Sequence, residues 1–277
     1  LISVALLCSC SKETKDLTTG TSTIKFNVGM TVDSFTPRTR STTEELVAAS
    51  KCIDFYDYKD GAIQNEIHQK SIDAGYGVIS SELDYGQHDC YIVAHNSTTL
   101  TPNFDTHLFD FDKVTDTFVW HQSLTVDEST STTVNTSLSR AVGKIEIEAA
   151  DAIPVNAASI ILTITGYSSK MAMETGVGES SLTTITRTFT YSEAQKGLKN
   201  TTYSVYSFIP PDTYKVNVTL QVLDANSNEL NFVTIDNAPI YLNKITHYTG
   251  KLFTKSIDGS FPINILTNWG ETINYNY

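Results

Sequence analysis

The stretch AVGKIEIEAAD, residues 141–151, sets the expected fold of this chain. In its central part every second residue is apolar, so that Ile145 and Ile147 fall on one side of an extended backbone. A period of two is typical of a β-strand with one buried face, because successive side chains of a strand point to opposite sides. We therefore expect a strand here, with Lys144 and Glu146 on its polar side.

Runs of the same kind recur along the chain and are separated by short turn-like segments. In the first half they are TIKFNV (23–28), KCIDFYDY (51–58), HDCYIVAHN (88–96) and DTFVWHQ (116–122). In the second half they cover residues 158–167, 183–191, 202–209, 214–224, 230–235, 246–254 and 260–269. A helix is expected only over STTEELVAAS (41–50), where hydroxyl residues precede a glutamate as in a capping box. Short, regularly spaced strands with one short helix in the first half predict an all-β chain of two tandem antiparallel β-sandwiches.

Length and charge agree with a two-domain protein that works outside the cell. The chain has 277 residues, enough for two cores of ordinary size, and a formal net charge of −12. An acidic surface repels phosphate backbones, so we expect no nucleic-acid partner. The Thr- and Ser-rich run at 129–139 marks the expected boundary. This divides the chain into an N-terminal sandwich over 23–138 and a C-terminal sandwich over 139–277.

The first residues, LISVALLCSCSK, end an apolar leader in two cysteines. A redox pair or a zinc half-site would need C-x-x-C spacing and a matching downstream pair, which the sequence lacks. The run instead resembles a bacterial lipobox, with Leu7 at −3, Ser9 at −1 and Cys10 as the residue that takes the lipid. An ordinary secretory leader with incidental cysteines is the alternative, and in either case we expect its basic start to precede Leu1. Residues 1–10 are thus predicted to be a lipoprotein signal and 11–22 a flexible tether.

The sequence carries no recognisable catalytic motif, such as a G-x-S-x-G elbow, an H-E-x-x-H pair or a P-loop. The histidines are spread along the chain and are interpreted as surface residues; they are His68, His88, His95, His107, His121 and His247. Two acidic clusters lack calcium-loop spacing and are interpreted as solvated loops; they are Asp54, Asp57 and Asp60, then Asp110, Asp112 and Asp116. We therefore predict no enzyme activity, no metal and no cofactor.

Aromatic residues and cysteines on the expected strands are given structural roles. Core or cross-strand packing is favoured over sugar stacking for the aromatic residues Tyr56, Tyr58, Tyr85, Tyr91 and Trp120. Cys52 and Cys90 each lie near the start of an expected strand. In an exported protein they form either a disulfide or two buried free thiols, and the sequence leaves both open.

Several segments share a pattern with one known family. In the second half they are SRAVGKIEIEAADAIP (139–154), NKITHYTGKLF (243–253) and FPINILTNWGETIN (261–274). In the first half they are YDYKDG (56–61) and YGQHDCYIVAHN (85–96). Together with the lipobox, they resemble the fimbrillin-type subunits and anchor proteins of Bacteroidales type V fimbriae, closest to the minor-fimbria anchor branch. The resemblance covers most of the chain.

The resemblance implies two transthyretin-like sandwich domains and assembly with other fimbrial subunits through strand addition. In stalk subunits an Arg-specific protease removes the first strand, and a strand from a neighbour takes its place. TIKFNV would be that strand here, and Arg38 and Arg40 follow it in FTPRTRST (35–42), where Pro37 opposes regular structure. Members of the anchor branch keep their N-terminus, so two alternatives stay open: the chain is cleaved at these arginines, or they lie in an ordinary uncut loop.

The expected function is that of a non-enzymatic fimbrial lipoprotein at the cell surface, an anchor, accessory or tip subunit that contributes to cell adhesion. Its partners would be other fimbrial subunits, the outer membrane through the lipid, and a host or bacterial surface ligand. The alternative is a surface glycan-binding outer-membrane lipoprotein. A displaceable terminal strand would favour the first function, and a flat row of exposed Tyr or Trp side chains would favour the second.

Overall fold

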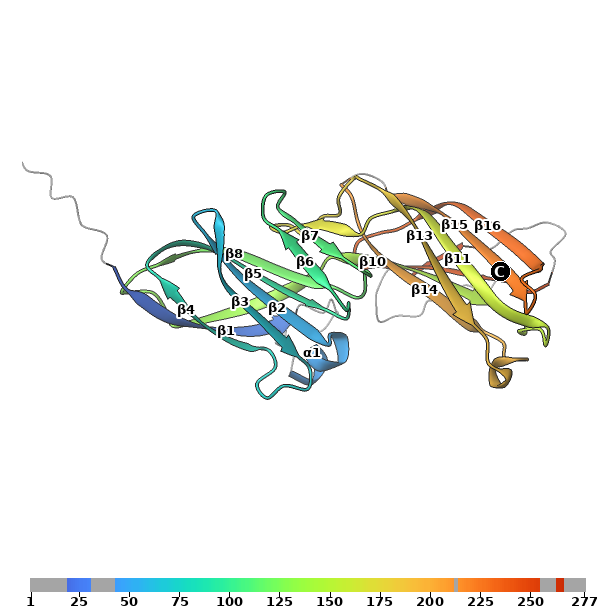
Figure 1. The fold of residues 1–277 in the computed structure, drawn as a ribbon, viewed down its shortest axis with the longest axis horizontal. Helices are drawn as coiled ribbons and strands as arrows, with labels where there is room; N and C mark the ends of the chain where they lie inside the picture. Colours follow the sequence, from blue (N-terminus) through green and yellow to red (C-terminus); the bar gives the residue numbers. More distant parts are fainter. Residues whose placement is uncertain (1–18, 31–42, 212–213, 255–262, 267–277) are drawn as a thin grey trace, which may run out of the picture.

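The computed structural model describes residues 19–30, 43–211, 214–254 and 263–266, which are almost wholly β (Figure 1). The first half contains β1 (Thr21–Met30), α1 (Thr43–Ala49), β2 (Cys52–Lys59), β3 (Ala62–Lys70), β4 (Val78–Asp84), β5 (Gly86–His95), β6 (Leu100–Asn103), β7 (Leu108–Phe111), β8 (Phe118–Val126) and β9 (Thr133–Arg140). The second half contains β10 (Val142–Ala149), β11 (Ala157–Tyr167), β12 (Lys170–Ala172), β13 (Thr183–Thr190), the 3-10 turn η1 (Glu193–Gln195), β14 (Thr201–Phe208), β15 (Lys215–Asp224), β16 (Glu229–Pro239), β17 (Ile245–Gly250) and β18 (Ile263–Leu266). The all-β prediction with a short helix in the first half is confirmed. None of the helices in these residues is long and apolar enough to cross a lipid bilayer.

The turn between β2 and β3 shows how local sequence sets the pairing. Asp60 and Gly61 join the two antiparallel strands with φ values of 52° and 82°. Positive φ at both central residues is what a two-residue type I′ hairpin requires, and glycine adopts it without steric cost. The sequence Lys59-Asp60-Gly61 is thus the turn of a β-hairpin.

Seven strands of the first half form one sheet in the order β3-β2-β5-β8-β9-β1-β4. β8 and β9 pair through only two residue pairs at one end, so the sheet turns over at this point. The β4-β1-β9 part and the β3-β2-β5-β8 part then share one core, which includes Phe26 of β1, Phe55 of β2 and Ile92 of β5. The first half is thus a sandwich made by a single bent sheet.

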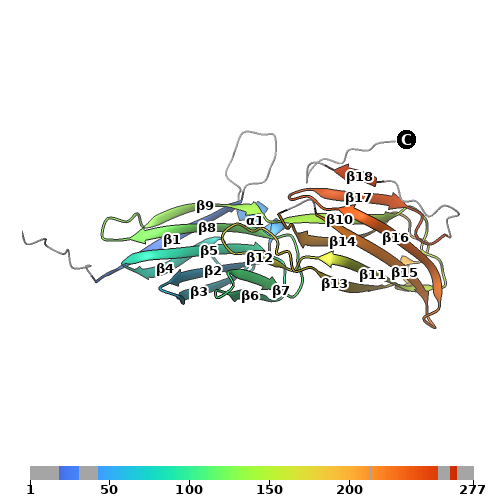
Figure 2. The same ribbon diagram turned by 90° about the horizontal axis from the view of Figure 1, so that it is seen from above.

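A hairpin of β6 and β7 covers the other face of β2 and β5. The Phe109 ring of β7 lies 5.6 Å from the ring of Tyr56 and 6.2 Å from that of Tyr91. β7 also pairs with β12, which belongs to the second half, and the three strands make a small sheet at the junction (Figure 2). The central strands of the first half are therefore covered on both faces, and the two halves are joined by backbone hydrogen bonds.

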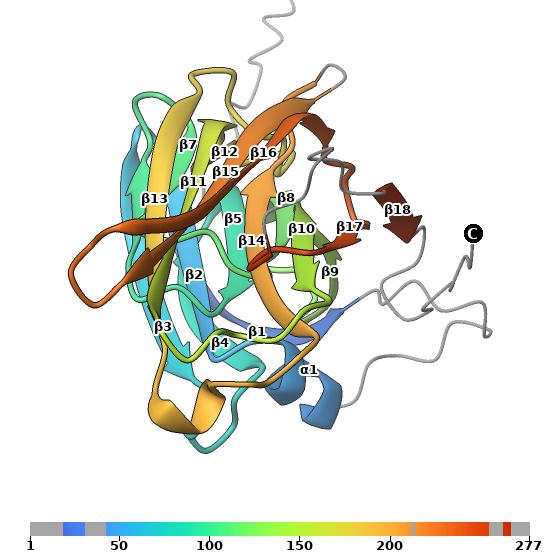
Figure 3. The same ribbon diagram turned by 90° about the vertical axis from the view of Figure 1, so that its right-hand side faces the viewer.

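The second half is a sandwich of two four-stranded sheets, β14-β10-β17-β18 and β13-β11-β15-β16. Ile145 and Ile147 of β10 and Ile160 and Leu162 of β11 belong to its core. The alternation that predicted β10 as a half-buried strand is confirmed. Figure 3 looks along the long axis and places β17 and β18 at one margin of the molecule, with β13 nearer the opposite margin.

Two strand pairs run parallel, in contrast to the wholly antiparallel sandwiches that we expected. β1 runs parallel to β9, with Val28 opposite Thr136, and β10 runs parallel to β17, with Ile147 opposite Tyr248. In both halves the first strand lies beside a later strand that runs in its own direction. Side-chain periodicity identifies a strand but says nothing about the direction of its partner.

The Thr- and Ser-rich run that marked the expected boundary is largely a strand. Its second part belongs to β9, in which Thr136 and Leu138 are buried. Threonine is β-branched and suits a pleated surface, so a Thr-rich segment forms a strand when a partner strand is available. The passage from the sheet of the first half to those of the second lies between Arg140 and Val142.

Candidate functional site

β1 fills a slot between β9 and β4, which we call the β1 slot. One edge of β1 forms seven antiparallel residue pairs with β4, and the other edge forms six parallel pairs with β9. The β4 pairs cover residues 21–27 and the β9 pairs residues 25–30, so β1 is paired on both edges over residues 25–27. Removal of β1 would leave a row of unpaired N–H and C=O groups along both neighbouring strands, which is a template for another strand.

The inner face of β1 supplies part of the core of the first half. Ile24 and Phe26 are fully buried. The Phe26 ring lies 5.0 Å from the ring of Phe55 and 6.1 Å from that of Trp120, and Leu46 of α1 joins the same core. Without β1 this core would keep a cavity the size of two large side chains, which is costly because packed interiors collapse only in part.

The outer face of β1 is polar and carries contacts that align it with its neighbours. The Asn27 side-chain amide donates to Asn135 of β9 at 3.0 Å, and the Thr21 hydroxyl donates to Glu82 of β4 at 2.7 Å. These hydrogen bonds are exposed, so their net contribution is small. They favour the observed register, while the buried row supplies the binding energy.

The sites that the sequence predicted lie mainly outside the described residues. Cys10, Arg38 and Arg40 all do so. By sequence, both arginines lie in the segment that links Met30, the last residue of β1, to Thr43, the first residue of α1. A cut there would leave β1 attached to the rest of the fold by non-covalent contacts alone.

Cys52 and Cys90 are free thiols in the structure, which is the second of the two alternatives left open by the sequence. They lie on the paired strands β2 and β5, but Cys52 is opposite His95 while Cys90 is opposite Asp57. The offset of five residues (57 − 52) corresponds to about 17 Å along a strand, beyond the reach of a disulfide. Burial raises the pKa of the Cys90 thiol, which makes it unreactive.

Sequence reasoning missed two buried carboxylate–histidine contacts on β2 and β5. Asp57 and His88 are both fully buried, and the Nδ1 atom of His88 lies 2.6 Å from Oδ1 of Asp57. Its Nε2 atom lies 2.8 Å from the carbonyl oxygen of Asp84. Each ring nitrogen of His88 therefore faces an acceptor. The interpretation of Asp57 as a solvated loop residue and of His88 as a surface residue was wrong.

Asp54 is held in a similar way on the opposite face of β2. Its carboxylate lies 2.7 Å from Nε2 of His95 and 2.6 Å from Nδ1 of His68. The backbone N–H of Ser97 donates to Nδ1 of His95, so Nε2 carries the proton that is donated to Asp54. Burial alone would raise the pKa of Asp54, but the hydrogen bonds from the two histidines outweigh it and the pKa is lowered. The surface interpretation was therefore wrong for Asp54 and His95.

The aspartates of the second acidic cluster, Asp110, Asp112 and Asp116, also form hydrogen bonds or an ion pair. Asp116 receives two hydrogen bonds from the Arg140 guanidinium, at 2.7 and 3.1 Å, and Asp112 accepts from the backbone N–H of Thr99 at 3.1 Å. Asp110 lies on β7, 3.2 Å from the ammonium group of Lys170. The Asp110–Lys170 contact joins the two halves. The solvated-loop interpretation was wrong for Asp116, whose side chain is largely buried, but Asp112 is exposed in the loop after β7 as expected.

Aromatic packing agrees with the sequence prediction. Tyr56 and Tyr91 are buried in the core, and the ring of Tyr58 stacks on Phe104 at 4.5 Å. Among the described residues, the large hydrophobic side chains that are exposed include only two aromatics, Phe232 and Tyr241. A flat row of Tyr or Trp is not found in this part of the chain. The same residues contain no group of three or more His, Cys, Asp and Glu side chains that could hold a metal ion.

Comparisons with known proteins identify a family and a fold. Residues 86–276 match a model described as a family of unknown function, DUF6562. No curated protein sequence matches this chain.

Solved structures share the fold at low sequence identity. A putative adhesin from Bacteroides thetaiotaomicron has a TM-score of 0.53 and 8% identity, over 90% of this chain and 98% of its own. A putative adhesin from Bacteroides ovatus has a TM-score of 0.51 and 11% identity, over 84% and 88%. The fimbrial anchor protein Mfa2 from Porphyromonas gingivalis has a TM-score of 0.50 and 8% identity, over 90% and 98%. The chain therefore belongs to the DUF6562 family, and it shares its fold with the two Bacteroides putative adhesins and with the Porphyromonas gingivalis fimbrial anchor protein.

Proposed function

We propose that this protein is a non-enzymatic fimbrial lipoprotein, an anchor, accessory or tip subunit of a surface fibre that is assembled through strand addition. The β1 slot is the observation that supports this proposal most directly. A first strand that is paired on both edges and supplies a buried row is a strand whose place another chain could take. The proposal includes an outer-membrane location through a lipid on Cys10, and a contribution to cell adhesion.

The position of β1 in the chain makes exchange physically accessible. β1 is followed by the segment that contains Arg38 and Arg40, and no backbone connection other than this one leads from it to β2–β18. If the segment stays intact, the slot remains filled and the protein is a tethered subunit. If it is cut, β1 is held in the slot by non-covalent contacts alone, and a strand from another subunit can compete with it for the same contacts.

We further propose that the two sheet systems are separate folding domains, over 23–138 and 139–277. The shared hairpin sheet of β6, β7 and β12 then acts as a fixed joint between them. A fixed joint suits a subunit that transmits force along a fibre, because the domains are held by backbone hydrogen bonds rather than by a bare linker.

Strand exchange can be measured on the intact chain. An Arg-specific protease is used to cut purified protein, and a fluorescent peptide with the β1 sequence GTSTIKFNVGM (20–30) is then added. We expect the peptide to replace the resident strand in the cut protein, which fluorescence anisotropy would report, while the uncut protein takes up no label. The matched control protein carries Arg38→Gln and Arg40→Gln, which removes both cleavage sites.

A control peptide with Phe26→Asp distinguishes specific strand exchange from non-specific binding of the peptide. It should not bind, because a carboxylate cannot enter the apolar row without a large desolvation cost. Equal binding of both peptides, or no exchange in the cut protein, would overturn the strand-addition proposal. On cells, mass spectrometry of the mature protein decides its place in the fibre, since an acylated Cys10 marks a tethered subunit and an N-terminus at Ser41 marks a released one.

The glycan-binding alternative has less support from the surface. Exposed aromatic residues of the described chain do not line up as a platform, as noted above.

A further inference from the structure

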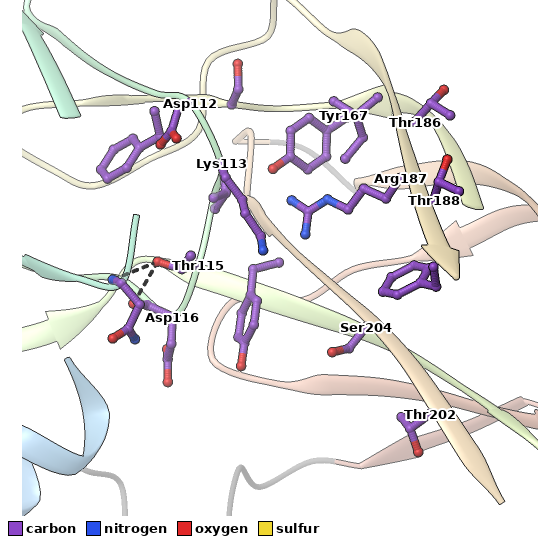
Figure 4. A pocket seen from close by; sticks show the side chains of 17 residues that line it. Asp112, Lys113, Thr115, Asp116, Tyr167, Thr186, Arg187, Thr188, Thr202 and Ser204 are labelled. Carbon is purple, nitrogen blue, oxygen red and sulfur yellow. Dashed lines mark hydrogen bonds between the residues drawn. The ribbon is translucent and has the colours of Figure 1, made fainter. Parts of the chain in front are cut away.

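A groove of about 930 Å³ lies where β13 and β14 of the second half meet the loop after β7 (Figure 4). Its size is within the range of small-molecule sites. One wall is formed by Ile185 to Phe189 of β13, another by Thr202, Ser204 and Tyr206 of β14, and a third by residues 111–116 of the first half. The groove therefore exists only when both halves are in place.

Arg187 breaks the side-chain pattern of β13. Along this strand Ile185 and Phe189 turn inward and pack against the core of the second half, and Arg187 lies between them on the same side. A charged residue in an apolar row is a local conflict, and such conflicts concentrate at functional sites. The Arg187 guanidinium points into the groove rather than out to solvent (Figure 4).

A second cation and a buried hydroxyl group point toward the same place. The Lys113 ammonium group reaches into the groove from the opposite wall, and the Tyr167 hydroxyl points toward both cations (Figure 4). Tyr167 is only 2% exposed, and the Arg187 guanidinium and the Val114 backbone lie beside its hydroxyl. Burial raises the pKa of Tyr167 to about 12, and the charge of Arg187 acts against this rise. A neutral donor and two cations thus converge on one region.

The acidic residues of the groove are occupied elsewhere. Asp116 is held by both arms of the Arg140 guanidinium, and Asp112 accepts from a backbone N–H. Neither Lys113 nor Arg187 forms an ion pair with a described carboxylate. In a chain with a net charge of −12, two cations without a carboxylate partner in one groove leave room for an anionic group from outside.

The remaining lining indicates what kind of molecule carries that anionic group. Thr202 and Ser204 of β14 line the groove, and Phe189 of β13 lines it as well. Hydroxyls with an aromatic face match a sugar ring, which presents hydroxyl groups and apolar C–H faces. Inorganic phosphate would fill only a small part of this volume.

We propose that the groove between β13, β14 and the loop at 111–116 binds an acidic saccharide, with its carboxylate between Arg187 and Lys113 and within reach of the Tyr167 hydroxyl. Thr202 and Ser204 of β14 and Phe189 of β13 then contact the sugar rings. The site adds a ligand to the adhesion role proposed above, but it does not depend on strand addition. It lies on different strands from the β1 slot, so failure of one proposal leaves the other standing.

Calorimetry on the full chain tests the proposal with matched ligands. The probes are trigalacturonic acid, a hyaluronan tetrasaccharide and sialyllactose, each compared with its methyl ester, which keeps the sugar and removes the charge. Inorganic phosphate and triglutamate serve as non-sugar anions. We expect at least one acidic sugar to bind, its ester to bind about tenfold more weakly or worse, and the non-sugar anions to bind weakly.

Variants assign the binding to this groove. Arg187→Gln and Lys113→Gln should each lower the affinity for the acidic sugar by about tenfold. Lys199→Gln removes an exposed lysine outside the groove and should leave this affinity unchanged. Lys113 is itself exposed, so its variant tests the site even if Arg187→Gln disturbs the fold. The proposal is overturned if no acidic sugar binds, if esters bind equally well, if triglutamate alone binds, or if both groove variants keep wild-type affinity.

Discussion

β2 and β10 are both eight-residue strands, but they bury their side chains in different ways. β10 buries one face, and its other face carries the half-exposed residues Lys144, Glu146 and Glu148. β2 is covered on both faces, so that Asp54 and Asp57 are buried along with their apolar neighbours. The difference comes from the β6–β7 hairpin, which adds a third layer over β2 and has no counterpart over β10 among the residues that the structure describes.

This comparison shows how similar side chains take on different energetic roles. The Asp57–His88 contact is fully buried, whereas Glu146 and His247 meet at 3.0 Å on a face that is partly open to water. Breaking a buried pair lowers the free energy of unfolding strongly, because the remaining group is left in the protein interior with neither its partner nor water to stabilise it. A half-exposed pair can exchange its partner for water.

The largest effect is expected at the core of the β1 slot. Phe26→Ala should lower the free energy of unfolding by about 3–5 kcal/mol, because it opens a cavity beside Phe55 and Trp120. Chemical denaturation measures this change. Lys25→Ala, at the exposed neighbouring position on the same strand, is the control and should change stability by less than about 0.5 kcal/mol. Equal effects at the two positions would show that β1 does not contribute to the core as described.

A slightly smaller loss is expected when the buried pair is broken. Asp57→Ala should cost about 3 kcal/mol, because it leaves the buried His88 ring without its carboxylate and removes the acceptor of Asn65. Asp105→Ala, on an exposed stretch, is the matched control. A cost below about 1 kcal/mol for Asp57→Ala would mean that this pair behaves like the half-exposed pair of the second half.

For the Glu146–His247 pair of the second half, we expect fold stability to depend more on pH than on the removal of one side chain. The hydrogen bond from His247 is the main cause that lowers the pKa of Glu146, to about 2, and the same bond raises the pKa of His247. The contribution of Glu146 is present above its ordinary pKa of 4.5 and is lost as pH falls toward about 2. That of His247 is present below 6.5 and is lost as pH rises through its raised value.

The pair should therefore stabilise the fold most between pH 4.5 and 6.5, where both groups are charged. Thermal unfolding across this range measures the effect. Glu146→Gln should flatten the profile and cost about 1 kcal/mol near pH 5.5, while Glu128→Gln on an exposed loop should leave the profile unchanged. A profile that keeps its shape in Glu146→Gln would contradict the assignment.

The smallest effect concerns the joint between the halves. Lys170→Gln removes an ion pair with Asp110 whose two side chains are each more than 40% exposed, so it should cost only about 0.2–1 kcal/mol. Backbone pairing of β7 with β12 should hold the joint without it. Hydrogen exchange at Phe109 and Met171 measures this directly, and marked deprotection in the variant would show that the ion pair, not the backbone, holds the halves together.

Sequence patterns predicted the strands well where one face is open to water. β10, β11 and β15 follow the expected runs closely, and α1 lies within the expected helix. β3, β4, β6, β7, β9 and β12 were not predicted, because they are short, polar or lack clear alternation. The groove was not predicted either, since it gathers residues from 96 to 206 that are far apart in sequence. Arg187 within the row of Ile185 and Phe189 was the one local signal that could have pointed to it.

The sequence by itself determined that this chain is built from short β-strands with one helix, because alternation and turn residues act over a few neighbouring positions. Tertiary structure alone decided which of those strands have both faces covered. It thereby turned acidic and histidine residues that resembled surface groups into buried pairs. It also placed β1 between two partners, one of them parallel, and brought two cations to one groove. These outcomes depend on contacts between distant segments, whose free energy no local pattern encodes.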